Sequence, residues 1–297
     1  MRVLIVGCGY VGLPLGKELA RLGHEVSGLR RSALAEAEMK AAGIMPLHAD
    51  ITQPETLTKL PRDFDWVVNC TASGGGGGDD YRRIYYEGNR NLVAWLVDSP
   101  PKKFVYTSST SVYGQNDGAL VTEKEATEPD APTSKVLVET EKFLLAAVAE
   151  HKFPAVILRV AGIYGPGRGH SFKAFLRGEA RIEGDGARWL NMIHRDDLIG
   201  VIIALLHDAQ PGEIFNVADN APVSQLKFFE WLAAELKRPI PPTVPADAEV
   251  WRKRGMTNKR VSNAKLCATL KYQFQFPDFR AGYAAELARL AAEDFPV

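Results

Sequence analysis

The chain has 297 residues, of which 46% are hydrophobic and 24% are charged, a composition typical of a soluble globular protein. Its 36 lysines and arginines balance 36 aspartates and glutamates, so the net charge is zero and gives no support to a nucleic-acid or anionic-membrane partner. Cys8, Cys70 and Cys267 are too far apart for metal-ligand spacing, and no apolar run approaches the length of a membrane span. We therefore expect a soluble cytoplasmic protein with no metal centre, formed by two domains or by one α/β unit with an appendage.

The N-terminal segment predicts a dinucleotide-binding site. Residues 3–6 are apolar, residues 7–12 read GCGYVG, and leucines then recur at helical spacing. This is the strand, Gly-x-Gly-x-x-Gly and helix order of the dinucleotide-binding fingerprint. Gly7 would allow the tight turn, Gly9 would let a pyrophosphate approach the backbone, and Gly12 would let the helix pack closely on the strand. The free amides at the helix start, around Tyr10 and Val11, would then face the phosphates, although a plain glycine-rich turn is the alternative.

Strands and helices alternate through the first half of the chain. The predicted strands after the fingerprint are residues 25–29, 44–50, 66–70, 103–106 and 155–159, and the predicted helices are residues 33–42, 81–97 and 133–151. Apolar strands that alternate with helices imply a parallel sheet covered on both faces.

The second half has a different texture. Residues 165–169 (GPGRG) and the proline-rich residues 239–245 are typical of loops, whereas residues 214–217 indicate a strand and residues 224–236 a helix. Five consecutive glycines at residues 74–78 predict a mobile loop at the carboxyl end of a strand. Ligands bind at that edge of open α/β sheets.

The end of the second strand favours NADP over NAD. A cofactor with a free ribose hydroxyl usually meets an acidic residue about twenty positions past the last glycine. Here that place holds Arg30 and Arg31, whose guanidinium groups suit a ribose phosphate. The alternative is that the two arginines only solvate a strand end. Asp50, at the end of the third strand, would accept a hydrogen bond from the adenine amino group or cap the helix that follows.

Hydroxyl side chains crowd residues 107–114 (TSSTSVYG), directly after the strand at 103–106. At the carboxyl edge of a strand they are well placed to hydrogen-bond a substrate oxygen beside the cofactor. A serine-rich turn would have the same composition.

Together with four other segments, this one resembles the NAD(P)-dependent epimerase/dehydratase family, the extended short-chain dehydrogenase/reductases. The segments follow the family's order and span nearly the whole chain: residues 107–114, 159–167 (RVAGIYGPG), 192–198 (MIHRDDL), 214–217 (IFNV) and 260–266 (RVSNAKL). The resemblance implies an α/β fold, a Rossmann-type doubly wound parallel sheet with a smaller, discontinuous C-terminal substrate domain.

The resemblance also implies a division of the chain. Residues 1–164, with a returning segment at about 190–220, would form the dinucleotide-binding domain. Residues 165–189 and about 221–297 would form the substrate-binding domain. Family members commonly pair through the two long helices predicted above, so we expect a homodimer.

The sequence departs from the family at the catalytic position. Family catalysis rests on a Ser or Thr, a Tyr, and a Lys four residues after that Tyr; the tyrosine exchanges the proton. Ser109 and Lys135 match the serine and the lysine, but the tyrosine position holds Ala131. Extended members also space their first glycines more widely. Both departures resemble the atypical subgroup, whose members often lack the tyrosine.

Another group must therefore handle the proton if hydride transfer survives. Tyr81, Tyr85, Tyr86 and Tyr164 are candidates, but a tyrosine on an amphipathic helix is more often a packing residue. His194 would titrate near neutral pH, yet a structural hydrogen-bonding role is the more frequent one.

Other candidates concern binding rather than proton transfer. Lys135 would bind the nicotinamide ribose even without the tyrosine. Arg159 and Arg168 would hold a phosphate or carboxylate, or be surface charges. Cys8 is expected to be a small residue that the turn requires.

These arguments define one set of expected site residues. The catalytic residues are Ser109 and Lys135; the cofactor-binding residues are Gly7, Gly9, Tyr10, Val11, Gly12, Arg30, Arg31, Asp50, Thr71 and Lys135; and the substrate-binding residues are Ser111, Tyr164, Arg168 and His194.

Three functions fit this set. The first is an NADP-dependent oxidoreductase or epimerase/dehydratase, with NAD possible, acting on a nucleotide-sugar-like polar metabolite through a nonstandard acid/base. The second is a catalytically silent NADP(H)-binding sensor or scaffold, which Ala131 favours. The third is an enzyme that uses the nucleotide structurally or acts without net redox change.

Overall fold

The computed structural model describes residues 1–74, 77–245 and 257–292. Its centre is a seven-stranded parallel sheet with the strand order β3-β2-β1-β4-β5-β7-β12. The strands are β1 (Arg2–Val6), β2 (Glu25–Arg30), β3 (Ile44–His48), β4 (Trp66–Asn69), β5 (Lys103–Ser109), β7 (Ala155–Val160) and β12 (Ile214–Val217). The order reverses beside β1, which produces the crevice that dinucleotides occupy in this type of sheet. The Rossmann-type doubly wound fold is confirmed.

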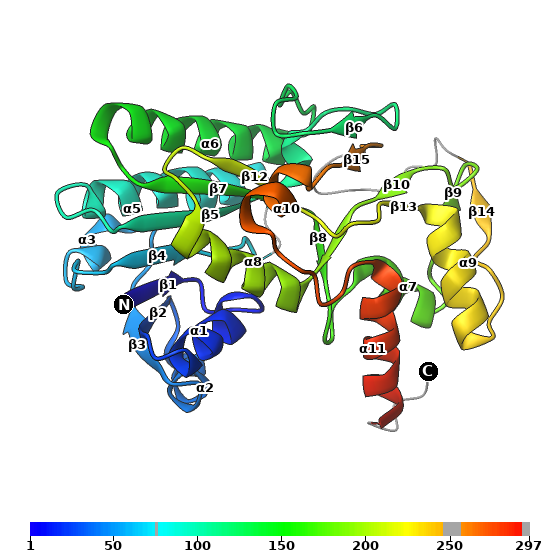
Figure 1. Ribbon diagram of the computed structural model, residues 1–297, viewed down its shortest axis with the longest axis horizontal. Coiled ribbons are helices and arrows are strands. Elements are labelled where there is room, and N and C mark those ends of the chain that lie inside the picture. The colour runs from blue at the N-terminus through cyan, green and yellow to red at the C-terminus, as the bar shows by residue number, and fades with distance from the viewer. Residues whose placement is uncertain (75–76, 246–256, 293–297) are drawn as a thin grey trace.

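Helices cover both faces of this sheet (Figure 1). They are α1 (Gly12–Arg21), α2 (Glu36–Ala41), α3 (Pro54–Leu57), α4 (Gly78–Tyr81), the π-helical η2 (Arg82–Glu87), α5 (Gly88–Leu96), α6 (Pro132–His151), α8 (Arg195–Asp208) and α10 (Ala264–Leu270). Short 3-10 turns lie at η1 (Ala33–Ala35) and η3 (Thr110–Val112). The helix predicted at 81–97 thus begins earlier, at Gly78, and its middle is π-helical. Two residues of the glycine run, 75 and 76, lie outside the described residues.

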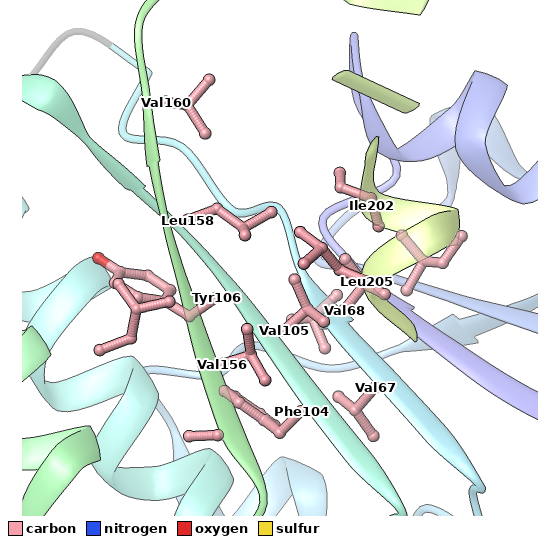
Figure 2. Close-up of a cluster of buried hydrophobic side chains, with 14 of the residues drawn as sticks. Val67, Val68, Phe104, Val105, Tyr106, Val156, Leu158, Val160, Ile202 and Leu205 are labelled. Atoms are coloured by element: carbon pink, nitrogen blue, oxygen red, sulfur yellow. The ribbon is translucent and has the colours of Figure 1, made fainter. Parts of the chain in front are cut away.

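The sheet interior is apolar, as the strand sequences predict. Figure 2 shows side chains of β4, β5 and β7, including Val68, Val105 and Leu158, with Ile202 and Leu205 of α8 packed beside them. All five are buried, and successive residues of each strand point to opposite faces. Burial on both faces explains why these strands are continuous apolar runs rather than alternating ones.

The part of the chain outside the main sheet forms short strands and helices, most of which lie in the right half of Figure 1. Four two-stranded pairs are formed by β6 (Leu120–Val121) with β15 (Arg260–Val261), β8 (Gly162–Tyr164) with β11 (Met192–His194), β9 (Ile182–Glu183) with β14 (Thr243–Val244), and β10 (Trp189–Leu190) with β13 (Val223–Ser224). The helices of this region are α7 (His170–Leu176), α9 (Gln225–Leu236) and α11 (Phe279–Ala292).

A second hydrophobic cluster joins these small elements. Phe172, Phe228, Phe279 and Tyr283 pack together there, separately from the core of the sheet. The predicted division at residue 164 stays a prediction. Val261, however, was expected in the substrate domain and packs in the core of the sheet. None of the helices in the described part of the chain is long and apolar enough to cross a membrane.

Candidate active site

A single large cavity, of about 920 Å³, opens along the carboxyl ends of the central strands and extends toward the second cluster. Twelve of the expected site residues line it: Gly7, Gly9, Tyr10, Val11, Arg30, Arg31, Asp50, Thr71, Ser109, Ser111, Tyr164 and Arg168. The lining set does not include Gly12, Lys135 or His194. Most of the residues singled out from sequence are therefore brought together in one place.

The glycine loop between β1 and α1 fits a dinucleotide pyrophosphate. Gly7 has a φ of +91°, and a Cβ there would lie 2.9 Å from backbone atoms of Thr71, so a side chain is excluded. A Cβ at Gly9 would meet no protein atom within 4 Å, so the wall of the cavity is open there. A Cβ at Gly12 would collide with the carbonyl oxygen of Gly7, which is why the helix can approach only with glycine at that position.

At the start of α1 the Leu13 amide donates to the Gly9 carbonyl at 3.0 Å and Pro14 has no N–H, so the amides that can meet a phosphate lie before Leu13. The N-cap residue of α1, Val11, makes no side-chain capping hydrogen bond. The first amides of a helix attract anions, because they lack partners within the helix and the helix dipole is positive there. Together with the opening at Gly9, this matches the phosphate-binding role predicted for the loop.

The adenosine end of the cavity carries two arginines and one carboxylate. Arg30 ends β2 beside the exposed Arg31, whose Nη1 lies 3.9 Å from Asp50 Oδ2. Asp50 Oδ1 accepts hydrogen bonds from the amide and hydroxyl of Thr52, at 2.9 and 2.8 Å. Asp50 therefore closes the turn after β3 rather than capping α3, and its second oxygen remains at the cavity with Arg31.

The middle of the cavity is lined by hydroxyl groups. Ser109 is the last residue of β5, and its Oγ accepts a hydrogen bond from the amide of Ser111 at 3.2 Å. Ser111 Oγ is buried and has no hydrogen-bond partner among the described residues. Thr71 donates its hydroxyl to Asn69 Oδ1 at 2.8 Å, across the carboxyl end of β4. A buried hydroxyl without a protein partner at a cavity wall is suited to a ligand.

Comparison with known proteins agrees with this geometry. Residues 3–218 match the NAD dependent epimerase/dehydratase family. The chain belongs to this family. It is 28% identical over 288 residues to the Protein YeeZ of Escherichia coli, covering 93% of this chain and 97% of YeeZ. A solved protein of Methylobacillus flagellatus assigned to the NAD-dependent epimerases/dehydratases is 33% identical, with a TM-score of 0.75 over 98% of both chains.

A more distant structure shares the fold. The UDP-glucuronic acid 4-epimerase of Bacillus cereus, solved with UDP-glucuronic acid and NAD, has a TM-score of 0.82 at 21% identity over 99% of this chain and 100% of its own. The chain thus shares the fold of this structure over nearly its whole length, and its family is one of enzymes.

The catalytic helix departs from the family's constellation in space as well as in sequence. Ala131 is the N-cap of α6, and neither it nor Lys135 lines the cavity. Lys135 is exposed on the first turn of α6. In this structure the lysine position is therefore not directed to the site that Ser109 occupies, and Ala131 has no proton to exchange.

The four tyrosine candidates separate into two pairs. Tyr81 and Tyr86 do not line the cavity; Tyr81 packs on Tyr85 and Tyr86 on Phe143. Tyr85 lines it, but its hydroxyl accepts a hydrogen bond from the Ser73 amide at 3.2 Å.

The remaining tyrosine, Tyr164, is a packing residue that also lines part of the cavity. Tyr164 is buried, stacks on Tyr283 and donates to the Asp278 carbonyl at 3.3 Å. Burial raises the pKa of its phenol far above the ordinary value, which opposes proton release.

His194 has a structural role. It is the N-cap of α8, and its Nδ1 accepts a hydrogen bond from the amide of Asp196 at 3.2 Å. Burial lowers the pKa of His194, partly offset by Asp196 and Asp197, so the imidazole is neutral and can accept this bond. Its ring packs on Phe276. The expectation that His194 binds substrate has no support from the cavity lining.

Arg159 is a buried structural residue, not a phosphate ligand or a surface charge. Its Nη2 lies 2.8 Å from Glu141 Oε2, and its Nη1 donates to Tyr113 Oη at 2.8 Å. Glu141 also accepts from Ser108 Oγ at 2.5 Å, and Tyr113 Oη donates to Asn216 Oδ1 at 2.8 Å. This network fixes the turn that carries Ser109.

Beyond the adenosine end, the cavity is lined by further cationic side chains. Arg168 lines it with its guanidinium 4.8 Å from the centre of the Tyr10 ring, and Lys173, Arg188 and Lys259 line it as well. Sequence reasoning identified Arg168 but missed the other three. They lie in segments without a recognisable motif, so only the fold brings them to the cavity.

Cys8 is buried, as expected for a small residue in a turn. Burial raises the pKa of its thiol to about 12, so the reactive thiolate is not formed.

Proposed function

We propose that the protein is an NADP-dependent epimerase/dehydratase or oxidoreductase that acts on an anionic, nucleotide-sugar-like metabolite. One observation carries the proposal: one cavity joins the glycine loop, the hydroxyls of Ser109 and Ser111, and cationic side chains beyond the adenosine end. When bound, a nicotinamide cofactor would supply the hydride acceptor or donor. The chain would bind it at Gly9 and the start of α1, and Ser109 would orient the reacting oxygen.

The preference for NADP is supported by the charge at the adenosine end. Arg30 and Arg31 both line the cavity there, and the nearest carboxylate, on Asp50, is engaged by Thr52 and faces Arg31. Guanidinium groups bind phosphate through paired hydrogen bonds, whereas a 2′-hydroxyl would be best matched by a free carboxylate. We therefore place the 2′-phosphate of NADP between the two arginines.

The substrate class is supported by the charge of the whole lining. Among the described residues that line the cavity, six are lysine or arginine (Arg30, Arg31, Arg168, Lys173, Arg188 and Lys259), and Asp50 is the single carboxylate. Arg188 pairs with Glu183 at 3.5 Å, and Arg168 and Lys173 leave an excess of positive charge that favours a second anionic ligand. UDP-glucuronic acid, the ligand of the Bacillus cereus structure, is one compound of this class.

The first experiment is titration of the purified protein with NADPH and NADH, followed by nicotinamide fluorescence. We expect NADPH to bind more tightly. The NADP+ complex is then offered UDP-glucose, UDP-glucuronic acid and dTDP-glucose, and appearance of nicotinamide fluorescence reports hydride transfer. Failure of both cofactors to bind would refute the proposal.

A cofactor-binding sensor is the second candidate, and Ala131 at the N-cap of α6 is the observation that favours it. It predicts tight NADPH binding that no polar metabolite perturbs and no hydride transfer with any of them. The cationic lining favours the enzyme, because a sensor has no need of a second anionic pocket.

We also propose that the protein is a homodimer formed through the α4-η2-α5 segment and α6, and that it works in the cytoplasm. All three cysteines are free in the structure, which suits a reducing compartment. Light scattering after size-exclusion chromatography measures the mass, and a monomeric mass would refute the dimer.

A further inference from the structure

Lys259 is a buried amine at the wall of the cavity. Its exposed fraction is 3%, and it is among the residues that line the cavity. Nζ donates hydrogen bonds to the carbonyl of Tyr113 at 3.0 Å and to Thr257 Oγ1 at 2.7 Å. No ion pair of Lys259 is present among the described residues. A lysine is seldom buried without a paired carboxylate, and burial without one favours the neutral amine.

The backbone around Lys259 is held in place. Asn191 Nδ2 donates to the carbonyl of Lys259 at 2.8 Å, and Asn191 Oδ1 accepts from the amide of Val261 at 2.7 Å. Asn258 is bonded through its backbone to Gln115 and Gly118, and its Oδ1 accepts from the Trp189 amide at 3.0 Å. The amine is therefore presented by a fixed scaffold rather than by a free side chain.

The amine is also hydrogen-bonded to the end of the turn that begins at the predicted catalytic serine. Tyr113, whose carbonyl Lys259 contacts, directly follows η3, and Ser109 is the N-cap of that turn. Ser111, with its unpartnered buried hydroxyl, lies between them. The hydroxyls and the amine thus border one part of the cavity, where a substrate oxygen beside the cofactor would lie.

The position that holds the proton-exchanging tyrosine in the family has no proton donor in this chain. Ala131 has no titratable group, and Tyr164 donates its hydroxyl to the Asp278 carbonyl. Tyr85 Oη accepts from the Ser73 amide and retains its own proton. His170 lines the cavity but is exposed at the start of α7. Lys259 is the buried lysine of the described lining.

We propose that Lys259 is the catalytic acid/base that replaces the tyrosine. This inference rests on the proposed function. In the oxidative direction a bound oxidised nicotinamide would accept the hydrogen of the carbinol C–H bond as hydride. The O–H bond breaks, its proton is taken by the neutral amine of Lys259, and the carbonyl forms. In the reductive direction the ammonium returns the proton to the oxygen.

The electrostatic surroundings favour this role. Burial lowers the pKa of Lys259 to about 8, and no ionisable neighbour offsets the shift among the described residues. The groups that face Nζ are the Tyr113 carbonyl and the Thr257 hydroxyl. Beyond the adenosine end, the charged residues of the lining are Arg168, Lys173 and Arg188. Its other titratable residues there are Tyr10, Cys70, Tyr85, Tyr164, His170 and Tyr283. An amine that titrates near the working pH serves in both directions.

The first test measures the amine itself and needs no substrate. The full-length protein is labelled with ¹⁵N at the lysine side chains, and the Nζ resonance of Lys259 is followed against pH in the NADP+ and NADPH complexes. The resonance missing from Lys259→Met gives the assignment, and Lys259→Arg gives it if the methionine variant does not fold. The two cofactors carry the same phosphates and differ in the charge of the nicotinamide ring. A difference in the midpoint of Lys259 between the two complexes therefore reports the ring charge alone.

We expect the midpoint of Lys259 to be lower with NADP+ than with NADPH by about one pH unit, because the positive ring opposes the ammonium. The resonance of the exposed Lys142 is the control, and exchanging the cofactor should leave it unchanged. Equal midpoints of Lys259 in the two complexes would overturn the inference while leaving the cofactor site intact. If neither cofactor moves any resonance, the proposed function itself has failed.

The second test uses the sugar nucleotides named above. Lys259→Met and Lys259→Arg should bind NADPH as the wild type does, but hydride transfer should fall by about 100-fold or more, and its rise with pH near 8 should be lost. Lys142→Met is the matched control and should retain the wild-type rate. Wild-type transfer in Lys259→Met would overturn the inference. If no compound of the panel reacts, the comparison of midpoints decides alone.

Discussion

The guanidinium of Arg159 and the carboxylate of Glu141 form a buried ion pair, with Nη2 2.8 Å from Oε2 and exposed side-chain fractions of 6% and 3%. The pair joins β7 to α6, and through Ser108 and Tyr113 it supports the turn that carries Ser109. Buried pairs contribute little over an apolar alternative, but loss of one partner leaves an uncompensated charge in the interior.

Glu141→Ala should therefore lower the free energy of unfolding by about 3–5 kcal/mol, measured by urea denaturation. The neighbouring helix residue Glu139 pairs with Arg82 at 2.6 Å, but both side chains are nearly half exposed. Glu139→Ala should change stability by about 0–1 kcal/mol. Equal losses in the two variants would contradict the structural role of the buried pair.

The double variant Arg30→Glu, Arg31→Ala should weaken NADPH binding by about 100-fold, because two charge-assisted hydrogen bonds to the 2′-phosphate are lost. NADH, which lacks that phosphate, should be affected much less. Fluorescence titration measures both affinities, and Arg62→Glu, at an exposed position outside the cavity, controls for a charge reversal away from the site. Equal losses for the two cofactors would refute the assignment of the 2′-phosphate site.

Two glycine substitutions should separate cofactor binding from stability. In Gly9→Ala the new methyl group meets no protein atom but occupies the place of the pyrophosphate, so the thermal midpoint should stay and NADPH binding should fall at least about 10-fold.

Gly12→Ala instead drives a methyl group into the Gly7 carbonyl and to 3.0 Å from Ile5, so it should cost about 2 kcal/mol or more of stability. Calorimetry and NADPH titration of both variants check this. A Gly9→Ala protein that binds NADPH normally would exclude the loop as the phosphate site.

Asp219 should make the protein less stable as the pH rises. Its side chain is buried, Oδ1 accepts from the Ala221 amide at 3.1 Å, and Oδ2 has no partner among the described residues. Burial raises the pKa of Asp219 from 3.8 to about 8, with the Ala221 hydrogen bond opposing and Asp278 and Asp197 adding to the shift. Between these two pKa values the folded state binds more protons than the unfolded state. The stability that protonated Asp219 provides is fully present below pH 3.8 and is lost as the pH rises toward 8.

Asp219→Asn replaces the protonated carboxyl by a neutral amide of the same shape. It should raise the free energy of unfolding at pH 8 by an amount on the order of 1–3 kcal/mol and leave it nearly unchanged at pH 4. Denaturation at both values measures this, with the exposed Asp98→Asn as control. A gain that is the same at both values would mean that Asp219 is ionised in the folded protein.

The sequence alone determined the Rossmann sheet and the dinucleotide end of the cavity. Both are encoded locally: a buried parallel strand is a continuous apolar run, and a strand, Gly7-Cys8-Gly9 and helix must fold into one kind of turn. Strand boundaries were close for the same reason, and β5 extends to Ser109 because its serines still pair with β7.

Tertiary structure decided the rest, because burial of a polar side chain depends on what distant segments bring to it. In the sequence, Arg159 comes after a run of apolar residues, where a charged side chain is expected at the surface. It is buried in the fold because Glu141 of α6 lies beside it and pairs with it. Lys259 directly precedes the family segment 260–266, but nothing in the sequence marks its side chain as buried. It becomes a buried amine because β15 pairs with β6 and Asn191 binds its backbone, more than sixty residues away in sequence.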